Sequence, residues 1–181
     1  MTACRKGDVS LNKTAVCPGS FDPITVGHLD IISRAARLFD QVVVLVSVNA
    51  AKHTSFSLEE RVELARKVTA HLDNVRVESF DGLLVDYLRN LGDCAIVKGL
   101  RAVSDFEYEF QMALANKKLY DGAETIFLTT GAENMYLSSS LVKQIAYFGG
   151  DISGFVPDCI LTEIKERLVL PQNGDSTGAA K

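Results

Sequence analysis

Hydrophobic and polar positions along the chain fall into two alternating patterns. The first is a short, nearly continuous apolar run, most complete over residues 41–48, where Val and Leu predominate. Such a run is typical of a strand that is covered on both faces, as in a parallel sheet. Shorter runs predict four further strands, at residues 14–17, 75–79, 94–98 and 125–129.

The second pattern is a helical periodicity between these runs, in which apolar residues recur every three to four positions. Two of the predicted helices are preceded by a capping box, Ser57 with Glu60 and Ser104 with Glu107. In a capping box the two side chains satisfy amide groups at the helix start, so these helices are expected to begin directly after Ser57 and Ser104. The periodicity predicts helices at residues 28–39, 58–72, 83–91, 105–119, 139–148 and 158–168.

The alternation of strands and helices predicts an α/β fold, a Rossmann-like doubly wound sheet of five parallel strands. A length of 181 residues favours a single domain. We expect this domain to span residues 14–168, between a polar N-terminal extension at 1–13 and a disordered tail at 169–181. Ligands of such sheets bind at the carboxyl ends of the strands, so motifs that follow strands are candidates for the site.

Composition narrows the classes of partner. The chain has 19 Lys and Arg against 23 Asp and Glu, a balance that argues against sequence-independent nucleic-acid binding. It has no run of 18 apolar residues and no apolar segment near its start, so we expect a soluble, cytoplasmic protein without a membrane partner. Four scattered cysteines and three histidines argue against a disulfide framework and against a zinc site.

The most informative motif follows the first predicted strand and reads Cys17-Pro-Gly-Ser-Phe-Asp-Pro-Ile-Thr-Val-Gly-His28. Gly19 allows a sharp turn, and Gly27 allows a ligand to approach the backbone. The helix that follows offers unpaired amides to an anion, towards which His28 would point. A structural turn with a solvated cap is the plainer alternative. The motif differs from the dinucleotide-binding and P-loop signatures.

Within this motif, Thr25-Val-Gly-His28 resembles the Thr/His-x-Gly-His signature of the nucleotidyltransferase superfamily. The string Pro18-Gly-Ser-Phe-Asp-Pro23 is similar to that of the bacterial phosphopantetheine adenylyltransferases, which catalyse the penultimate step of coenzyme A synthesis. The resemblance extends over residues 14–168 through several motifs in family order. It implies transfer of an adenylyl group from ATP to 4′-phosphopantetheine, feedback binding of coenzyme A, and a homohexamer.

The resemblance also implies roles for individual residues. His28 would be the catalytic residue and would contact the α-phosphate of ATP. The acceptor would be bound by Ser20, Lys52, Leu84, Lys98 and Asn116. ATP would be bound by His28 together with Ser20, Phe21, Gly99, Leu100, Arg101, Glu109, Asn134, Met135, Tyr136, Leu137, Ser138, Ser139 and Ser140.

Several of these side chains have an ordinary structural alternative. Lys98 and Arg101 could form salt bridges, Leu84 could belong to the core, and the serines could only cap a helix. The chain also departs from many relatives, which have Arg in place of Lys98 and Tyr or another residue in place of Cys17. Lysine lacks the bidentate fork of arginine, so phosphate geometry could differ while the reaction type stays the same.

The chemistry of the substrates suggests an in-line attack of the acceptor phosphate on the α-phosphorus of ATP. A phosphate monoester has a second pKa of about 6, so no strong general base is needed. Positioning and charge stabilisation would supply the catalysis. Mg²⁺ is expected to neutralise the leaving pyrophosphate, with no protein ligand identified. The alternatives are an adenylyltransferase for nicotinate or nicotinamide mononucleotide, a nucleotide-binding regulatory module, and an interaction scaffold.

Overall fold

A computed structural model describes residues 13–48, 53–101 and 103–169. Within these residues, five parallel strands and six α-helices form one α/β domain, so the predicted doubly wound fold is confirmed. The predicted terminal extensions lie almost wholly outside the described residues. The strands are β1 (Thr14–Gly19), β2 (Gln41–Ser47), β3 (Val75–Phe80), β4 (Cys94–Leu100) and β5 (Glu124–Thr129). The helices are α1 (Val26–Leu38), α2 (Leu58–Thr69), α3 (Leu84–Leu91), α4 (Val103–Leu119), α5 (Ser139–Tyr147) and α6 (Asp158–Leu168).

The order of strands in the sheet is β3-β2-β1-β4-β5, so the direction of winding reverses between β1 and β4. β1 pairs with β2 over its whole length, up to Gly19 opposite Val46. Its pairing with β4 ends at Val16 opposite Ile96, although both strands continue. The two strands therefore separate towards their carboxyl ends. This separation opens a crevice at the reversal point, where open α/β sheets bind their ligands.

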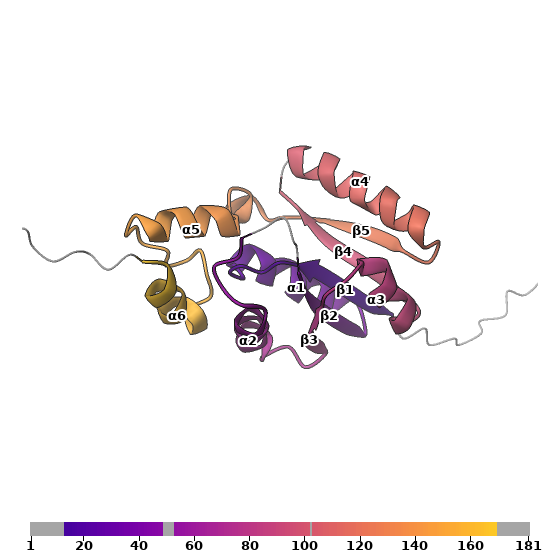
Figure 1. Cartoon of the computed structure of the whole chain (residues 1–181), viewed down its shortest axis with the longest axis horizontal. Helices are drawn as coiled ribbons and strands as arrows, with labels where there is room; N and C mark the ends of the chain where they lie inside the picture. The colour runs from indigo at the N-terminus through magenta and orange to yellow at the C-terminus, as the bar shows by residue number, and fades with distance from the viewer. Residues whose placement is uncertain (1–12, 49–52, 102, 170–181) are drawn as a thin grey trace, which may run out of the picture.

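The central strand β2 explains the unbroken apolar run in the sequence. Residues 42–46 are all fully or almost fully buried. One face of the sheet packs against Ile32 and Ala35 of α1, and the other against Val85 and Leu88 of α3. Figure 1 shows α4 lying along β4 and β5, with α5 and α6 together at one end of the molecule. Every helix in the described parts of the chain is too short or too polar to cross a membrane.

Two helix starts differ by two residues from the sequence prediction. α1 begins at Val26, two residues early, because the Thr25 side chain caps it by accepting a hydrogen bond from the amide of His28. α4 begins at Val103, so Ser104 lies inside the helix and not directly before it as predicted. An ion pair joins Arg101 to Asp105, four residues apart, at this helix start. The other predicted box, Ser57 with Glu60, is confirmed.

Burial along α1 predicts how substitutions change stability. Ile32→Ala should lower the free energy of unfolding by about 2–5 kcal/mol, because Ile32 is buried against the sheet and its loss leaves a cavity. Leu38→Ala, at an exposed position of the same helix, should cost about 0.5 kcal/mol or less. Urea unfolding at a fixed protein concentration measures both. Equal losses in the two variants would contradict this packing.

Candidate active site

A cleft of about 980 Å³ lies at the carboxyl ends of β1 and β4. Its walls come from the loop after β1, the first turn of α1, the end of β4, one side of α4 and the segment that leads into α5. The reversal point of the sheet and the cleft therefore coincide. The residues that line the cleft come from both halves of the sheet. This arrangement suits two ligands that meet at the centre of the cleft.

Most of the site residues predicted from the sequence line this one cleft. Leu100, Met135 and Tyr136 are not part of its wall, and the ring of Tyr136 instead packs edge-on against Phe155. Lys52 lies outside the described residues. The predicted residues that line the cleft are Ser20, Phe21, His28, Leu84, Lys98, Gly99, Arg101, Glu109, Asn116, Asn134, Leu137, Ser138, Ser139 and Ser140.

The loop after β1 owes its shape to Phe21. Phe21 has a φ of 48°, in the left-handed region, and its buried ring folds back over Gly19. A Cβ at Gly19 would lie 2.9 Å from that ring, so a side chain there would displace it. Gly19 itself is the last residue of β1, so it allows close packing and not the sharp turn expected from the sequence. The Phe21 ring also packs edge-on against His28, with 5.2 Å between ring centroids.

His28 is held in the first turn of α1 by Thr25. The amide of Thr25 donates a hydrogen bond to Nδ1 of His28 at 3.0 Å, and the amide of His28 donates to Oγ1 of Thr25 at 3.3 Å. Because Nδ1 accepts, the proton of the neutral ring sits on Nε2. Burial, and then the nearby charges of Arg101 and Lys98, lower the pKa of His28 to about 4. His28 is therefore a neutral ring with an Nε2–H donor at the wall of the cleft.

Two cations at the end of β4 pair with carboxylates of α4. Lys98 lies 3.3 Å from Glu109, and the guanidinium of Arg101 contacts both carboxylate oxygens of Asp105, at 2.7 and 3.1 Å. Arg101 also donates to the carbonyl oxygen of Leu137 at 2.7 Å. The salt bridges considered as an alternative in the sequence thus exist, but at the wall of the cleft. A bound phosphate would compete with Asp105 and Glu109 for the same donors.

Asp22 is a buried acceptor that the sequence reasoning left unassigned. It is 5% exposed and accepts hydrogen bonds from the amides of Ser55 and Phe56 at 3.0 Å. Its carboxylate also binds Nζ of Lys143 on α5 at 2.6 Å. These contacts tie the loop after β1 to the start of α2 and to α5. The position of Asp22 inside the apolar Phe-Asp-Pro-Ile string was the available signal, since a charge there needs a partner.

A second unassigned residue is Arg61 of α2, which is also buried. It falls on the apolar face of the helix with Leu58, Ala65 and Val68. A charged side chain on an apolar face is the signal that indicates a buried partner. Arg61 donates a hydrogen bond of 2.6 Å to the carbonyl oxygen of Ser20, directly behind the cleft.

The serines before α5 have partly structural roles. Oγ of Ser138 accepts a hydrogen bond from the amide of Leu141 at 3.1 Å and caps α5. Oγ of Ser139 donates to the carbonyl oxygen of Pro23 at 2.8 Å and so joins α5 to the loop after β1. Capping is thus the present role of Ser138. The start of α5 nevertheless opens onto the cleft, where its amides can meet an anion.

A thiol and three acidic side chains also line the cleft. Burial raises the pKa of the Cys17 thiol to about 12, so Cys17 is a neutral part of the cleft floor. Among the described residues, no three His, Cys, Asp or Glu side chains converge to hold a metal ion. Asp22, Asp105 and Glu109 are each paired with a cation. These side chains do not fit a resident metal site.

The fold has a counterpart among solved structures. A structure from Vibrio parahaemolyticus, provisionally assigned as a nicotinate-nucleotide adenylyltransferase, matches with a TM-score of 0.65. The match covers 88% of this chain and 99% of the other, at 19% sequence identity. At that identity the likeness supports the fold alone.

Sequence comparison identifies the family. The cytidylyltransferase-like family model matches residues 16–145. A phosphopantetheine adenylyltransferase from Caldanaerobacter subterraneus is 57% identical over 155 residues, covering 86% of this chain and 97% of that protein. One from Streptomyces coelicolor is also 57% identical, covering 86% and 98%. One from Dictyoglomus thermophilum is 52% identical, covering 88% and 98%. With such identity over nearly the whole length of these relatives, the chain belongs to the phosphopantetheine adenylyltransferase family of nucleotidyltransferases.

Proposed function

We propose that this protein transfers the adenylyl group of ATP to 4′-phosphopantetheine, forming dephospho-coenzyme A and pyrophosphate. The observation that carries the proposal is the gathering of His28, Lys98, Arg101 and the start of α5 around one cleft, in a chain of this family. Both substrates are phosphate-bearing, and each of these groups is a cation or a hydrogen-bond donor. The site is thus matched to two polyanions that meet in it.

Adenylyl transfer in this cleft needs no covalent intermediate with the protein. The acceptor phosphate is largely ionised near neutral pH, with a second pKa of about 6, and can attack the α-phosphorus directly. Negative charge on the α-phosphate changes most along this path. In this proposal the α-phosphate accepts a hydrogen bond from Nε2–H of His28, whose Nδ1 accepts from the amide of Thr25. A neutral donor held by the backbone costs no reorganisation when the charge develops.

The other roles follow from position and from the family motifs. Lys98 and Lys52 bind the acceptor phosphate, and Ser20 lies between the two substrates. Arg101 and Ser138–Ser140 bind the triphosphate, exchanging the carboxylate of Asp105 for phosphate oxygens. Leu84 and Asn116 line the part of the cleft that receives the pantetheine arm. The assignment of Phe21, Gly99, Leu100, Glu109, Asn134, Met135, Tyr136 and Leu137 to ATP rests on the family motifs.

Mg²⁺ belongs to this proposal as the counterion of ATP, because the described side chains do not form a cage for it. When bound, it neutralises charge on the leaving pyrophosphate. Coenzyme A contains both the pantetheine arm and the adenylate, so it can compete for the same cleft and provide feedback. A cytoplasmic location is also part of the proposal, because ATP is an intracellular substrate.

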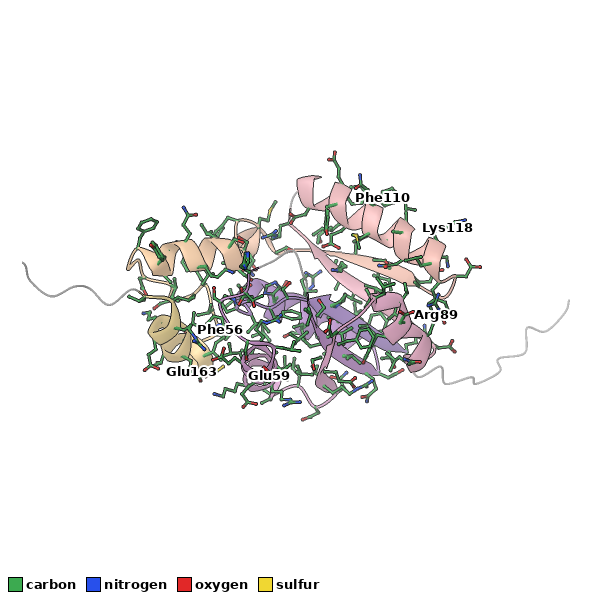
Figure 2. All side chains as sticks on the ribbon, viewed as in Figure 1. Phe56, Glu59, Arg89, Phe110, Lys118 and Glu163 are labelled. Atoms are coloured by element: carbon green, nitrogen blue, oxygen red, sulfur yellow. The ribbon has the colours of Figure 1, made fainter. Side chains whose placement is uncertain are left out.

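The exposed apolar residues of α4 support the proposal of a homohexamer. Phe106, Phe110 and Leu114 recur every four residues and are each more than 40% exposed in the single chain. Phe110 is labelled on α4 in Figure 2. A continuous exposed apolar stripe is typical of a subunit interface.

Pyrophosphate release tests the function. Purified protein with ATP and Mg²⁺ should release pyrophosphate with 4′-phosphopantetheine and not with nicotinate mononucleotide or without an acceptor. Release with the mononucleotide alone would move the assignment to the other adenylyltransferase. Binding of ATP without release for any acceptor would indicate a regulatory module instead.

The same assay tests the catalytic residue. His28→Ala should lower kcat by about 10²–10³-fold with a smaller change in KM for ATP, because the hydrogen bond to the α-phosphate strengthens in the transition state. His71→Ala, at an exposed position outside the cleft, should leave both constants unchanged. A folded His28→Ala variant with normal turnover would refute the role of His28.

The protonation of His28 has a measurable pH dependence. The ring should stay neutral from pH 8 down to about pH 5, since its pKa is lowered to about 4. The unfolded chain binds a proton near pH 6.5 and the folded chain does not, so this residue lowers stability as the pH falls from about 6.5 to 4. In ¹⁵N NMR, Nδ1 should have the shift of an unprotonated nitrogen and Nε2 that of a protonated one. Titration of His28 near pH 6.5 would contradict the assignment.

Light scattering tests the assembly. The mass in solution should correspond to six chains, and Phe110→Glu should lower it, because a buried carboxylate in an apolar interface is costly. Lys118→Glu, an exposed change near the C-terminal end of the same helix, is the control. A monomer at assay concentration would contradict the hexamer.

A further inference from the structure

The guanidinium of Arg61 donates hydrogen bonds to backbone carbonyl oxygens and not to a carboxylate. The side chain is 3% exposed, and its Nη1 donates to the carbonyl oxygens of Ser20 at 2.6 Å and Ser47 at 3.2 Å. Its Nε donates to the carbonyl oxygen of Ser57 at 3.3 Å. A buried guanidinium is costly unless its donors are used, and a planar fork can reach several acceptors where an ammonium cannot. The geometry therefore needs arginine.

The three carbonyl groups belong to three different segments. Ser20 follows β1, Ser47 ends β2, and Ser57 caps α2. In Figure 2, Phe56 and Glu59 mark the start of α2, on which Arg61 follows. Arg61 is not one of the residues that line the cleft, whereas Ser20 is. Arg61 can therefore act on a substrate only through the groups that it holds, of which the carbonyl of Ser20, at 2.6 Å, is bound more closely than that of Ser47, at 3.2 Å, which also belongs to a residue of the cleft wall.

That loop contains a backbone conformation that needs support. Phe21 has a φ of 48°, which costs energy for a residue with a bulky side chain and persists only where neighbours hold it. On one side of Phe21, Arg61 holds the carbonyl oxygen of Ser20. On the other side, Asp22 accepts hydrogen bonds from the amides of Ser55 and Phe56. Residues 55–61 thus form hydrogen bonds with the loop on both sides of Phe21.

The positions of the side chains that face the substrates depend on these hydrogen bonds. The carbonyl group that accepts from Arg61 belongs to Ser20, and the Phe21 ring packs against His28. We infer that Arg61 is a positioning residue for adenylyl transfer, acting through the peptide that joins Ser20 to Phe21; the inference rests on the proposed function. A purely structural role would lower stability alone, whereas positioning also lowers the rate of the chemical step in folded protein.

Arg61→Lys tests this, because it keeps the charge and removes the fork. In the folded variant, kcat with ATP and 4′-phosphopantetheine should fall by about 10²-fold, as for a misplacement near 1 Å, with little change in KM for ATP. The amides of residues 20–22 should exchange with solvent faster than in the wild type. Val68→Ala, at a buried position on the same helix, is the control and should lower Tm without changing kcat at the assay temperature.

Wild-type kcat in folded Arg61→Lys, or a loss no greater than that of Val68→Ala, would overturn the inference. Arg61→Gln provides a second variant with fewer donors and the same expected result. If neither variant folds while Val68→Ala does, Arg61 serves the fold alone and the inference also fails. Absence of turnover in the wild type would instead refute the proposed function, and amide exchange of residues 20–22 in Arg61→Lys would still show whether Arg61 holds the loop.

Discussion

The separation of β1 from β4 is the feature on which the site depends. The two strands pair as far as Val16 and Ile96 and then continue apart, so the residues at their ends face one crevice. The loop with Ser20 lies on one side, and Lys98 and Arg101 lie on the other. Helices α1 and α4 follow these strand ends and carry His28 and Glu109 into the same space. A different strand order would scatter these groups.

The second important feature of the cleft is that its cationic side chains are paired with carboxylates. Lys98, Arg101 and Lys143 each have a carboxylate partner, and these pairs hold the long side chains in place without a ligand. Phosphate groups carry more charge than a carboxylate and can replace it. His28 differs because its neutral ring is oriented by backbone and not by an ion pair. The cleft thus combines cationic side chains, which can exchange a carboxylate for a phosphate, with one fixed hydrogen-bond donor, the His28 ring. This arrangement suits the binding of two anions and the stabilisation of charge that develops between them.

The sequence predicted the sheet, its alternation with helices and most residues of the cleft, because these follow from periodicity and from local motifs. The buried run at 41–48 identified the central strand, and the string from Cys17 to His28 identified the loop. The sequence did not predict the start of α4, which lies at Val103 and so places Ser104 inside the helix.

Long-range contacts were the other limit. Asp22 meets Lys143, 121 residues away, and Arg61 meets Ser20, 41 residues away, so only the folded chain brings them together. Residue type gave a hint in both cases, a charge in an apolar setting, but not the partner. Tyr136 lies in a matching string, but its ring packs against Phe155 and is not part of the cleft wall, so its assignment to ATP stays a prediction from the motif.

The central claim is that the two substrates react directly with each other while the protein only positions them and stabilises charge. The stereochemical course at the α-phosphorus tests it most directly, using one diastereomer of ATP with sulfur on the α-phosphate and 4′-phosphopantetheine as acceptor. A single in-line transfer predicts inversion of configuration in the dephospho-coenzyme A product. Retention would require two displacements through an adenylylated residue and would contradict the account.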